Sequence, residues 1–166
     1  MLTKLRFDSV PLSELACKGL VADAIGHSPI VLVVDDEHII ADTRAAIFRS
    51  WGYTALTAYD AESALELAKV IPPELLVSDV LLARMNGVDL AIAIKKFVPD
   101  CKIVLFSGQP GTIDMLAAAR ISGHDFPLLD KPLHPAQLFT YLSTINFGPQ
   151  SVAKKELNRG EAKNSA

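Results

Sequence analysis

Three acidic residues directly follow two apolar runs of the sequence. Asp35 and Asp36 come after Ile30–Val34, and Asp79 comes after the run at residues 75–78. If these runs are parallel strands of one sheet, the three carboxylates lie at the same edge, where like charges repel unless a cation neutralises them. Mg²⁺ suits a site of one or two carboxylates that also keeps water and receives phosphate oxygens. The pattern therefore predicts a Mg²⁺ site with phosphate chemistry, although a lone Asp-Asp pair is equally well explained as helix caps.

Two further polar residues follow later apolar runs. Ser107 ends the run at residues 102–106, and Lys131 comes after the run at residues 126–129. Each has an ordinary explanation by itself, since Ser before Gly is a common turn residue and Lys is usually a solvated charge. At the same edge as three acids, however, they complete a set that contains a nucleophile, a hydroxyl donor and a cation. Chance placement of all five at strand ends is improbable.

Five apolar runs that alternate with amphipathic segments have to position these residues. Unbroken β-branched runs are typical of parallel strands buried on both faces. Strands are predicted at residues 30–34, 53–58, 75–78, 102–106 and 126–129, and helices at about residues 38–51, 61–71, 90–97, 113–121 and 134–145. Because crossovers between parallel strands are nearly always right-handed, this order predicts an α/β fold. The expected architecture is a flavodoxin-like, doubly wound, five-stranded parallel sheet, (βα)5, in a three-layer sandwich.

Local patterns give more specific expectations for the helices. Ile40, Thr43 and Ile47 share one side of the first helix, which Gly52 should end. Asp60 is the expected N-cap of the second helix, whose inner side carries Ala64, Leu65 and Ala68 and which Pro72-Pro73 closes. Met85-Asn86-Gly87 is expected to be a loop. Trp51 is expected to pack at a helix end and His38 to be solvated, and the remaining histidines His27, His124 and His134 lack metal-ligand spacing.

Composition excludes several classes of protein. The chain has 166 residues and a formal net charge of −3, without the basic excess on which nucleic-acid binding depends. No apolar run reaches the ~18 residues needed to cross a bilayer, so no membrane contact is expected. The two cysteines, Cys17 and Cys101, lack zinc-site spacing and suit reduced thiols in a cytoplasmic protein.

The chain divides into three parts by composition. Residues 1–28 form an N-terminal extension with a short helix expected within residues 15–25, residues 29–147 form the folded domain, and residues 148–166 form a flexible polar tail. Neither end resembles an output domain. The expectation is a stand-alone domain.

Four motifs resemble those of the response-regulator receiver domains of two-component signalling, which include the chemotaxis regulators. They are Val33-Val34-Asp35-Asp36-Glu37, Ser78-Asp79 with Met85-Asn86-Gly87, Phe106-Ser107-Gly108, and Asp130-Lys131-Pro132-Leu133. Their order, placement and spacing all match, and the likeness covers about residues 30–147. Each motif alone is weak, but the combination is specific to this family.

The resemblance implies a role for each site residue. Asp79 is then the phospho-acceptor, Asp36 a direct Mg²⁺ ligand, Asp35 a ligand acting mainly through water, and Leu81 a ligand through its backbone carbonyl. Lys131 and Ser107 would contact the phosphoryl group, and the Lys131-Pro132 bond would be cis. The implied protein is a phosphoprotein that catalyses only its own phosphorylation and dephosphorylation.

The resemblance also implies partners. A sensor histidine kinase or a phosphotransfer protein would donate the phosphoryl group, a downstream protein would receive the signal, and a homodimer is compatible with the family.

The sequence departs from the family at several positions. Ala83 stands where a proline is common, four residues after Asp79, and Leu128 stands where a switch aromatic is common, while Phe126 lies two residues earlier. Gly108 has no side chain to cover the phosphoryl group. Leu81 and Gln109 occupy positions that tune dephosphorylation in the family.

These departures leave two other functions open. One is a pseudo-receiver that binds partners without phosphorylation, against which the retention of all five site residues argues. The other is a Mg²⁺-dependent phosphohydrolase with Asp79 as covalent nucleophile, which would need a further acid or base and a substrate pocket that the sequence does not indicate.

Overall fold

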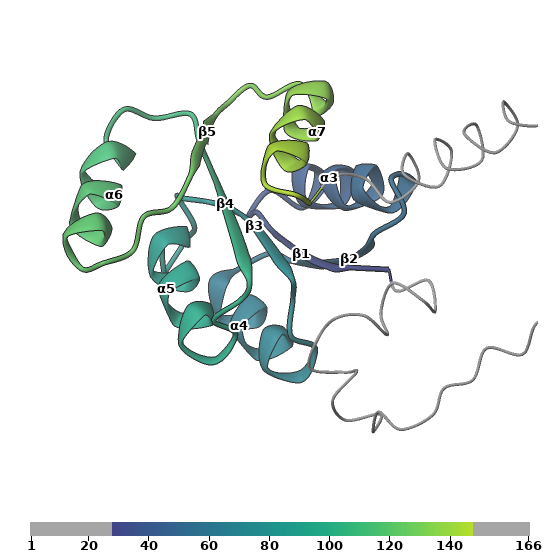
Figure 1. The fold of residues 1–166 in the computed structure, drawn as a ribbon. Helices are drawn as coiled ribbons and strands as arrows, with labels where there is room; N and C mark the ends of the chain where they lie inside the picture. Colours follow the sequence, from purple (N-terminus) through teal and green to yellow (C-terminus); the bar gives the residue numbers. More distant parts are fainter. Residues whose placement is uncertain (1–27, 148–166) are drawn as a thin grey trace, which may run out of the picture.

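The five apolar runs form one parallel sheet in the computed structural model, which describes residues 28–147 (Figure 1). The elements in chain order are β1 Ile30–Val34, α3 His38–Ser50, β2 Thr54–Ala58, α4 Ala61–Val70, β3 Leu75–Asp79, α5 Gly87–Phe97, β4 Lys102–Ser107, α6 Thr112–Ile121, β5 Leu128–Asp130 and α7 Pro135–Thr144. The helix expected within residues 15–25 and the tail expected at residues 148–166 lie outside the described residues.

The strand order β2-β1-β3-β4-β5 places a topological switch point between β1 and β3. The chain moves from β1 outward to β2 and then returns past β1 to β3, so the first two crossovers run in opposite directions along the sheet. Ligands of doubly wound sheets bind beyond the carboxyl ends of the strands at such a point. The acidic residues of β1 and β3 are therefore at the edge where a ligand site is expected.

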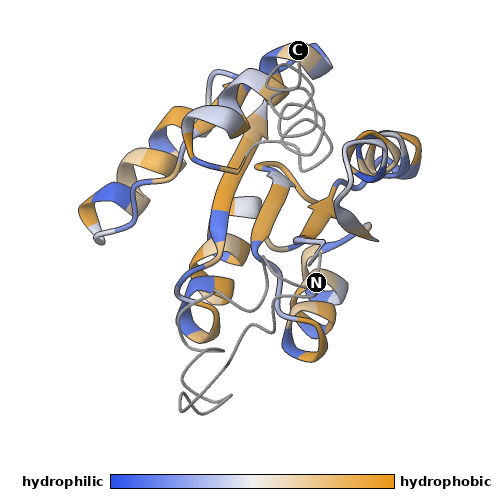
Figure 2. Ribbon diagram, turned by 45° about the vertical axis from the view of Figure 1, so that its right-hand side comes forward, coloured by the Kyte–Doolittle hydropathy of each residue, from blue (hydrophilic) through white to orange (hydrophobic). Residues whose placement is uncertain are grey.

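Helices cover both faces of the sheet and make a three-layer sandwich. Alternate residues of each strand point to opposite faces, so Val31 and Val33 pack with α3 and α7, while Leu32 and Val34 pack with α4, α5 and α6. Figure 1 shows the same division of the helices, and Figure 2 shows strands that are mostly apolar between helices that carry both polar and apolar residues. The predicted fold class is confirmed.

The buried side of α3 differs from the prediction. The fully buried residues are Ala41, Ala45 and Phe48, whereas Thr43 of the predicted side is exposed. Alanine contributes little to a hydropathy pattern, so the larger Ile40 and Ile47 drew the prediction away from the true contact side. Ile40 and Ile47 are half-buried, so they lie at the border of the contact side and not at its centre.

Two elements begin more than one residue away from their predicted limits. β5 begins at Leu128 rather than at residue 126, and Phe126 lies before it in a buried position where it stacks on His124. α5 begins at Gly87, so Asn86 is its N-cap and not the middle of a loop. The cap is formed by the Asn86 side chain, which accepts a hydrogen bond from the backbone N–H of Asp89 at 2.8 Å.

Trp51, His38 and Cys101 lie in the kinds of environment that the sequence predicts for them. Trp51 caps the C-terminus of α3 and packs edge-on against Phe48 and Phe139, as expected. His38 is exposed but stacks on Tyr59 with ring centroids 3.8 Å apart. Cys101 is a free, buried thiol whose pKa burial raises to about 11. Within residues 28–147 no helix combines the length and apolar character needed to cross a membrane.

Asp60 caps α4 as predicted. Its carboxylate accepts hydrogen bonds from the backbone N–H of Ser63 at 2.6 Å and from the Ser63 hydroxyl at 2.8 Å. The Ser63 backbone bond is the largest cause of the lowered pKa of Asp60, followed by the Ser63 hydroxyl bond.

Replacing this cap should destabilise the domain. We expect Asp60→Ala to lower the free energy of unfolding by about 1 kcal/mol at neutral pH, with Asp60→Asn costing less because an amide oxygen still accepts the Ser63 N–H. Since the pKa of Asp60 is lowered on folding, its contribution is complete above the unfolded-state pKa and is lost as the pH falls through the folded-state pKa. Urea unfolding of wild type, Asp60→Ala and Asp60→Asn, below about pH 4 and at neutral pH, measures the loss of stability and its pH dependence. An equal loss in the Asn and Ala variants would contradict the capping role.

Gly87 fits against the end of β3. Its N–H donates to the Val80 carbonyl at 2.8 Å, and a Cβ at this position would lie 2.0 Å from the backbone oxygen of Asp79 and 2.9 Å from the Ser78 hydroxyl. The start of α5 therefore approaches the strand that carries Asp79 more closely than any side chain permits.

Gly87→Ala should consequently be strongly destabilising. We expect a loss of about 3 kcal/mol, because the backbone of β3 or α5 has to move to remove the clash. Gly111→Ala is the matched control, since Gly111 precedes α6 with a φ outside the left-handed region, and a Cβ added there would meet no atom within 4 Å. Chemical denaturation measures both variants. Similar stabilities for the two would contradict the close approach.

Candidate functional site

The three acids meet at the switch point of the sheet. Asp35 and Asp36 follow β1, Asp79 is the last residue of β3, and each offers a carboxylate oxygen within 4.8 Å of the others. Asp35 is buried, Asp36 is exposed and Asp79 is intermediate. The convergence predicted from the sequence is therefore present, with a gradient of exposure from the interior to the solvent.

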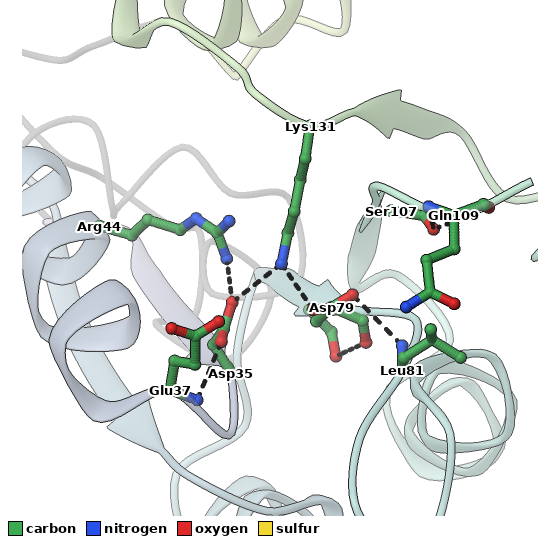
Figure 3. A network of polar contacts seen from close by, with 9 residues as sticks. Asp35, Glu37, Arg44, Asp79, Leu81, Ser107, Gln109 and Lys131 are labelled. Carbon is green, nitrogen blue, oxygen red and sulfur yellow. Dashed lines mark hydrogen bonds and ion pairs between the residues drawn. The ribbon is translucent and has the colours of Figure 1, made fainter.

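Lys131 joins two of these carboxylates (Figure 3). Its Nζ lies 2.5 Å from Oδ2 of Asp79 and 3.4 Å from Oδ2 of Asp35. Its backbone N–H donates to the Ser107 carbonyl at 2.8 Å, which fixes the lysine beside the end of β4. The Lys131-Pro132 bond is cis, as expected.

Asp35 has a second cationic partner that the sequence analysis missed. Nη1 of Arg44, on α3, lies 2.6 Å from Oδ2 of Asp35 (Figure 3). The guanidinium carbon lies 4.7 Å from the centroid of the Phe106 ring. The other oxygen of Asp35, Oδ1, accepts the backbone N–H of Glu37 at 3.1 Å. Helical spacing could have indicated this residue. Arg44 lies three residues after Ala41 and four before Phe48, which places its cation beside the buried side of α3.

Asp79 is held from both sides but stays accessible. Oδ2 contacts Lys131, and Oδ1 accepts the backbone N–H of Leu81 at 3.2 Å. Its side chain is 13% exposed, compared with 1% for Asp35. Of the two acids bound by Lys131, only Asp79 therefore presents oxygen atoms to an incoming group.

Ser107 lies at the same edge but points into its own loop. Its hydroxyl oxygen accepts the backbone N–H of Gln109 at 3.1 Å, and the Thr112 hydroxyl donates to the Gln109 carbonyl at 2.8 Å. Ser107 is 3% exposed. The hydroxyl is thus near the acids and the lysine but is engaged within the segment between β4 and α6.

The donor set at this edge suits a hard divalent cation. All three side-chain donors are carboxylate oxygens, which Mg²⁺ prefers, and the exposed Asp36 leaves room for water ligands. Arg44 and Lys131 supply two positive charges against three negative ones, so the site keeps an excess of negative charge. The residues present therefore fit Mg²⁺.

The sequence matches a known family model over most of the described domain. Residues 31–143 match the model of the response regulator receiver domain. The chain is 31% identical over 138 residues to the probable transcriptional regulatory protein TcrX of Mycobacterium tuberculosis, covering 78% of this chain and 58% of that protein. It is 34% identical over 110 residues to the nitrogen assimilation regulatory protein NtrX of Azorhizobium caulinodans, covering 65% of this chain but only 24% of that protein. The chain thus spans less than two thirds of the length of either relative.

Solved structures agree with the family assignment. The receiver domain of NtrX from Brucella abortus superposes with a TM-score of 0.60 and 34% identity, covering 69% of this chain and 95% of that domain. The signal receiver domain of an HD domain-containing protein from Pseudomonas fluorescens Pf-5 superposes with a TM-score of 0.64 and 27% identity, covering 70% of this chain and 93% of that one. The chain belongs to the response regulator receiver domain family of two-component systems.

Proposed function

We propose that this receiver domain accepts a phosphoryl group on Asp79 in a Mg²⁺-dependent reaction and signals through a protein contact. The observation that carries the proposal is the position of Asp79. It ends β3 at the switch point, partly exposed, with Lys131 on one oxygen and two further carboxylates beside it. This arrangement supplies a nucleophile, a cation for the incoming phosphoryl group and a set of metal ligands.

The proposed metal ligands are Asp36 and Asp79 through their side chains and Leu81 through its backbone carbonyl, with Asp35 acting mainly through water. Bound Mg²⁺ would offset the repulsion between the carboxylates and the phosphoryl oxygens. Asp36 lies toward the solvent and Asp79 beside it, so both carboxylates are accessible at the open side of the site.

The reaction at Asp79 is a displacement at phosphorus. An oxygen of Asp79 attacks the phosphorus atom and forms a new O–P bond, while the bond from phosphorus to the donor breaks. The electron pair of that bond leaves with the donor, which is the imidazole nitrogen of a phosphohistidine in a sensor histidine kinase or phosphotransfer protein, or an acetate oxygen in acetyl phosphate. Most of the catalysis comes from position and charge.

Lys131 and Ser107 exchange partners once Asp79 is modified. Lys131 Nζ, which contacts Oδ2 of Asp79, pairs with a phosphoryl oxygen instead. The Ser107 hydroxyl leaves Gln109 and donates to another phosphoryl oxygen, which draws the segment between β4 and α6 toward the site. This exchange shifts a two-state equilibrium of the surface formed by α6, β5 and α7.

That surface has the character of a protein contact. A hollow of about 480 Å³ lies over α6, β5 and α7, and its lining is mostly apolar, including Ile113, Leu116, Phe126, Leu128 and Tyr141. Ile113, which lines the hollow, is 64% exposed. Exposed apolar groups at the edge of a hollow are typical of protein interaction sites.

Intact mass tests the acceptor chemistry directly. After incubation with acetyl phosphate and Mg²⁺, the wild-type protein should gain one phosphoryl group, and Asp79→Asn or chelation of the metal should abolish the gain. Absence of labelling in folded wild-type protein would favour the pseudo-receiver, and stoichiometric labelling of Asp79→Asn would place the acceptor elsewhere. Repeated turnover of a small phosphate ester would favour a phosphohydrolase.

Lys131 should be needed for the response more than for the fold. We expect Lys131→Ala to remain folded but, after labelling, to show no change in the amide NMR shifts of residues 107–121, because the phosphoryl oxygen then lacks its cation. Lys69→Ala is the matched control, since Lys69 lies on α4 in an exposed pair with Glu66. A wild-type shift pattern in labelled Lys131→Ala would contradict the role.

A further inference from the structure

We propose that Arg44 is a fixed counter-ion for Asp35 that stabilises the acidic edge without metal and weakens its affinity for Mg²⁺. The inference rests on the Mg²⁺ site of the proposed function and assigns a positioning role to a residue outside the four motifs. It is carried by three observations: how the Asp35 carboxylate is occupied, how Arg44 is held, and how charge is distributed over the site.

The carboxylate of Asp35 is almost fully occupied by protein donors. Oδ2 contacts Arg44 Nη1 at 2.6 Å and Lys131 Nζ at 3.4 Å, and Oδ1 accepts the Glu37 N–H at 3.1 Å. A carboxylate has about four lone-pair positions. One position therefore remains, on Oδ1, and a metal ion that used it would share the carboxylate with Arg44, which makes the shortest of the three contacts.

Arg44 is held in place by its surroundings. The side chain is 16% exposed, and its guanidinium lies 4.7 Å from the ring centroid of Phe106, which is itself 1% exposed. Phe106 pairs with Asp79 in the register of β3 and β4, so the ring that supports the guanidinium belongs to the floor of the site. A planar guanidinium fixed by an ion pair and an aromatic face cannot turn to the solvent without losing both contacts.

The charge of the site depends on Arg44. With Arg44 and Lys131 present, the three carboxylates carry one excess negative charge, and without Arg44 they would carry two. A divalent cation is attracted more strongly by the second arrangement. A carboxylate buried as completely as Asp35 also needs a partner when no metal is bound, because burial of an unpaired charge is costly. Arg44 therefore stabilises the Asp35 carboxylate when no metal is bound, and its charge weakens the attraction of the site for Mg²⁺.

The test compares Mg²⁺ affinity in wild type and Arg44 variants, measured from the rise in unfolding free energy with MgCl₂ at constant ionic strength. We expect Arg44→Met to be less stable than wild type in EDTA and to bind Mg²⁺ roughly tenfold more tightly, as the loss of a nearby like charge implies. Arg44→Gln, which keeps a donor but not the charge, should show the same tightening and provides a second variant if Arg44→Met does not fold. Arg44→Lys should retain an affinity close to wild type.

Arg49→Met is the matched control. Arg49 lies on the same helix but donates to the Ala55 carbonyl at 2.7 Å and has no contact with an acid of the site among its hydrogen bonds in the described domain. Its loss should lower stability equally with and without Mg²⁺ and leave the affinity unchanged. In an Asp35→Asn background, Arg44→Met should tighten binding less than it does with Asp35 present, because the part of the effect that acts through the Asp35 carboxylate is then lost.

Two results would overturn the inference. One is an equal or lower Mg²⁺ affinity in folded Arg44→Met and Arg44→Gln, and the other is a loss of stability that Mg²⁺ does not offset, which would make Arg44 a packing residue only. The effect of Mg²⁺ on the stability of the wild-type protein distinguishes these two results from failure of the proposed function. If wild type is not stabilised by Mg²⁺, the metal site itself is absent and both proposals fall; if it is stabilised but the variants bind no more tightly, only the inference on Arg44 falls.

Discussion

Repulsion among three carboxylates is the constraint on which the rest of this site depends. Asp35, Asp36 and Asp79 meet because β1 and β3 are adjacent parallel strands that end at the same edge. The polar contacts to Asp35 and Asp79 compensate for that meeting: two cations, Arg44 and Lys131, and two backbone N–H groups, from Glu37 and Leu81, bind these carboxylates. The compensation is incomplete, and the remaining negative charge is what makes the edge receptive to a divalent cation.

The parallel sheet supplies this arrangement at little conformational cost. β1, β3 and β4 are short and mostly buried, so packing on both faces fixes where each of them ends. The ladder between β4 and β5 continues into the backbone contact between Lys131 and Ser107. The close approach of Gly87 to the Asp79 carbonyl fixes the third strand from the side of α5. Residues far apart in sequence are therefore held together by backbone geometry, and the side chains need few further contacts to be positioned.

The strand ends could be predicted from sequence because buried parallel strands appear as continuous apolar runs, and the polar residues that follow each run mark the edge of the sheet. Asp35, Asp79, Ser107 and Lys131 were all found in this way. Arg44 was not, because it lies on a helix, where the side that faces the sheet had to be inferred from small residues such as Ala41 and Ala45. The engagement of Ser107 by Gln109 also could not be predicted, since a hydroxyl rotates freely and its partner depends on the path of the loop. The length of β5 was overestimated because Phe126 is buried outside the ladder, and hydropathy does not distinguish burial from pairing.

With Asp79 unmodified, Lys131 and Ser107 are both engaged by other groups, Lys131 by Asp79 itself and Ser107 by Gln109. Phosphorylation at Asp79 would therefore act by exchanging partners and not by filling vacant donors. The free energy available for switching would then be the difference between two sets of hydrogen bonds, and not the full strength of either set. Because the Lys131 N–H is already bonded to the Ser107 carbonyl, movement of either residue is transmitted to the other. The two residues that would read the phosphoryl oxygens are thus joined through their backbones, where β4 leads toward α6 and β5 leads toward α7.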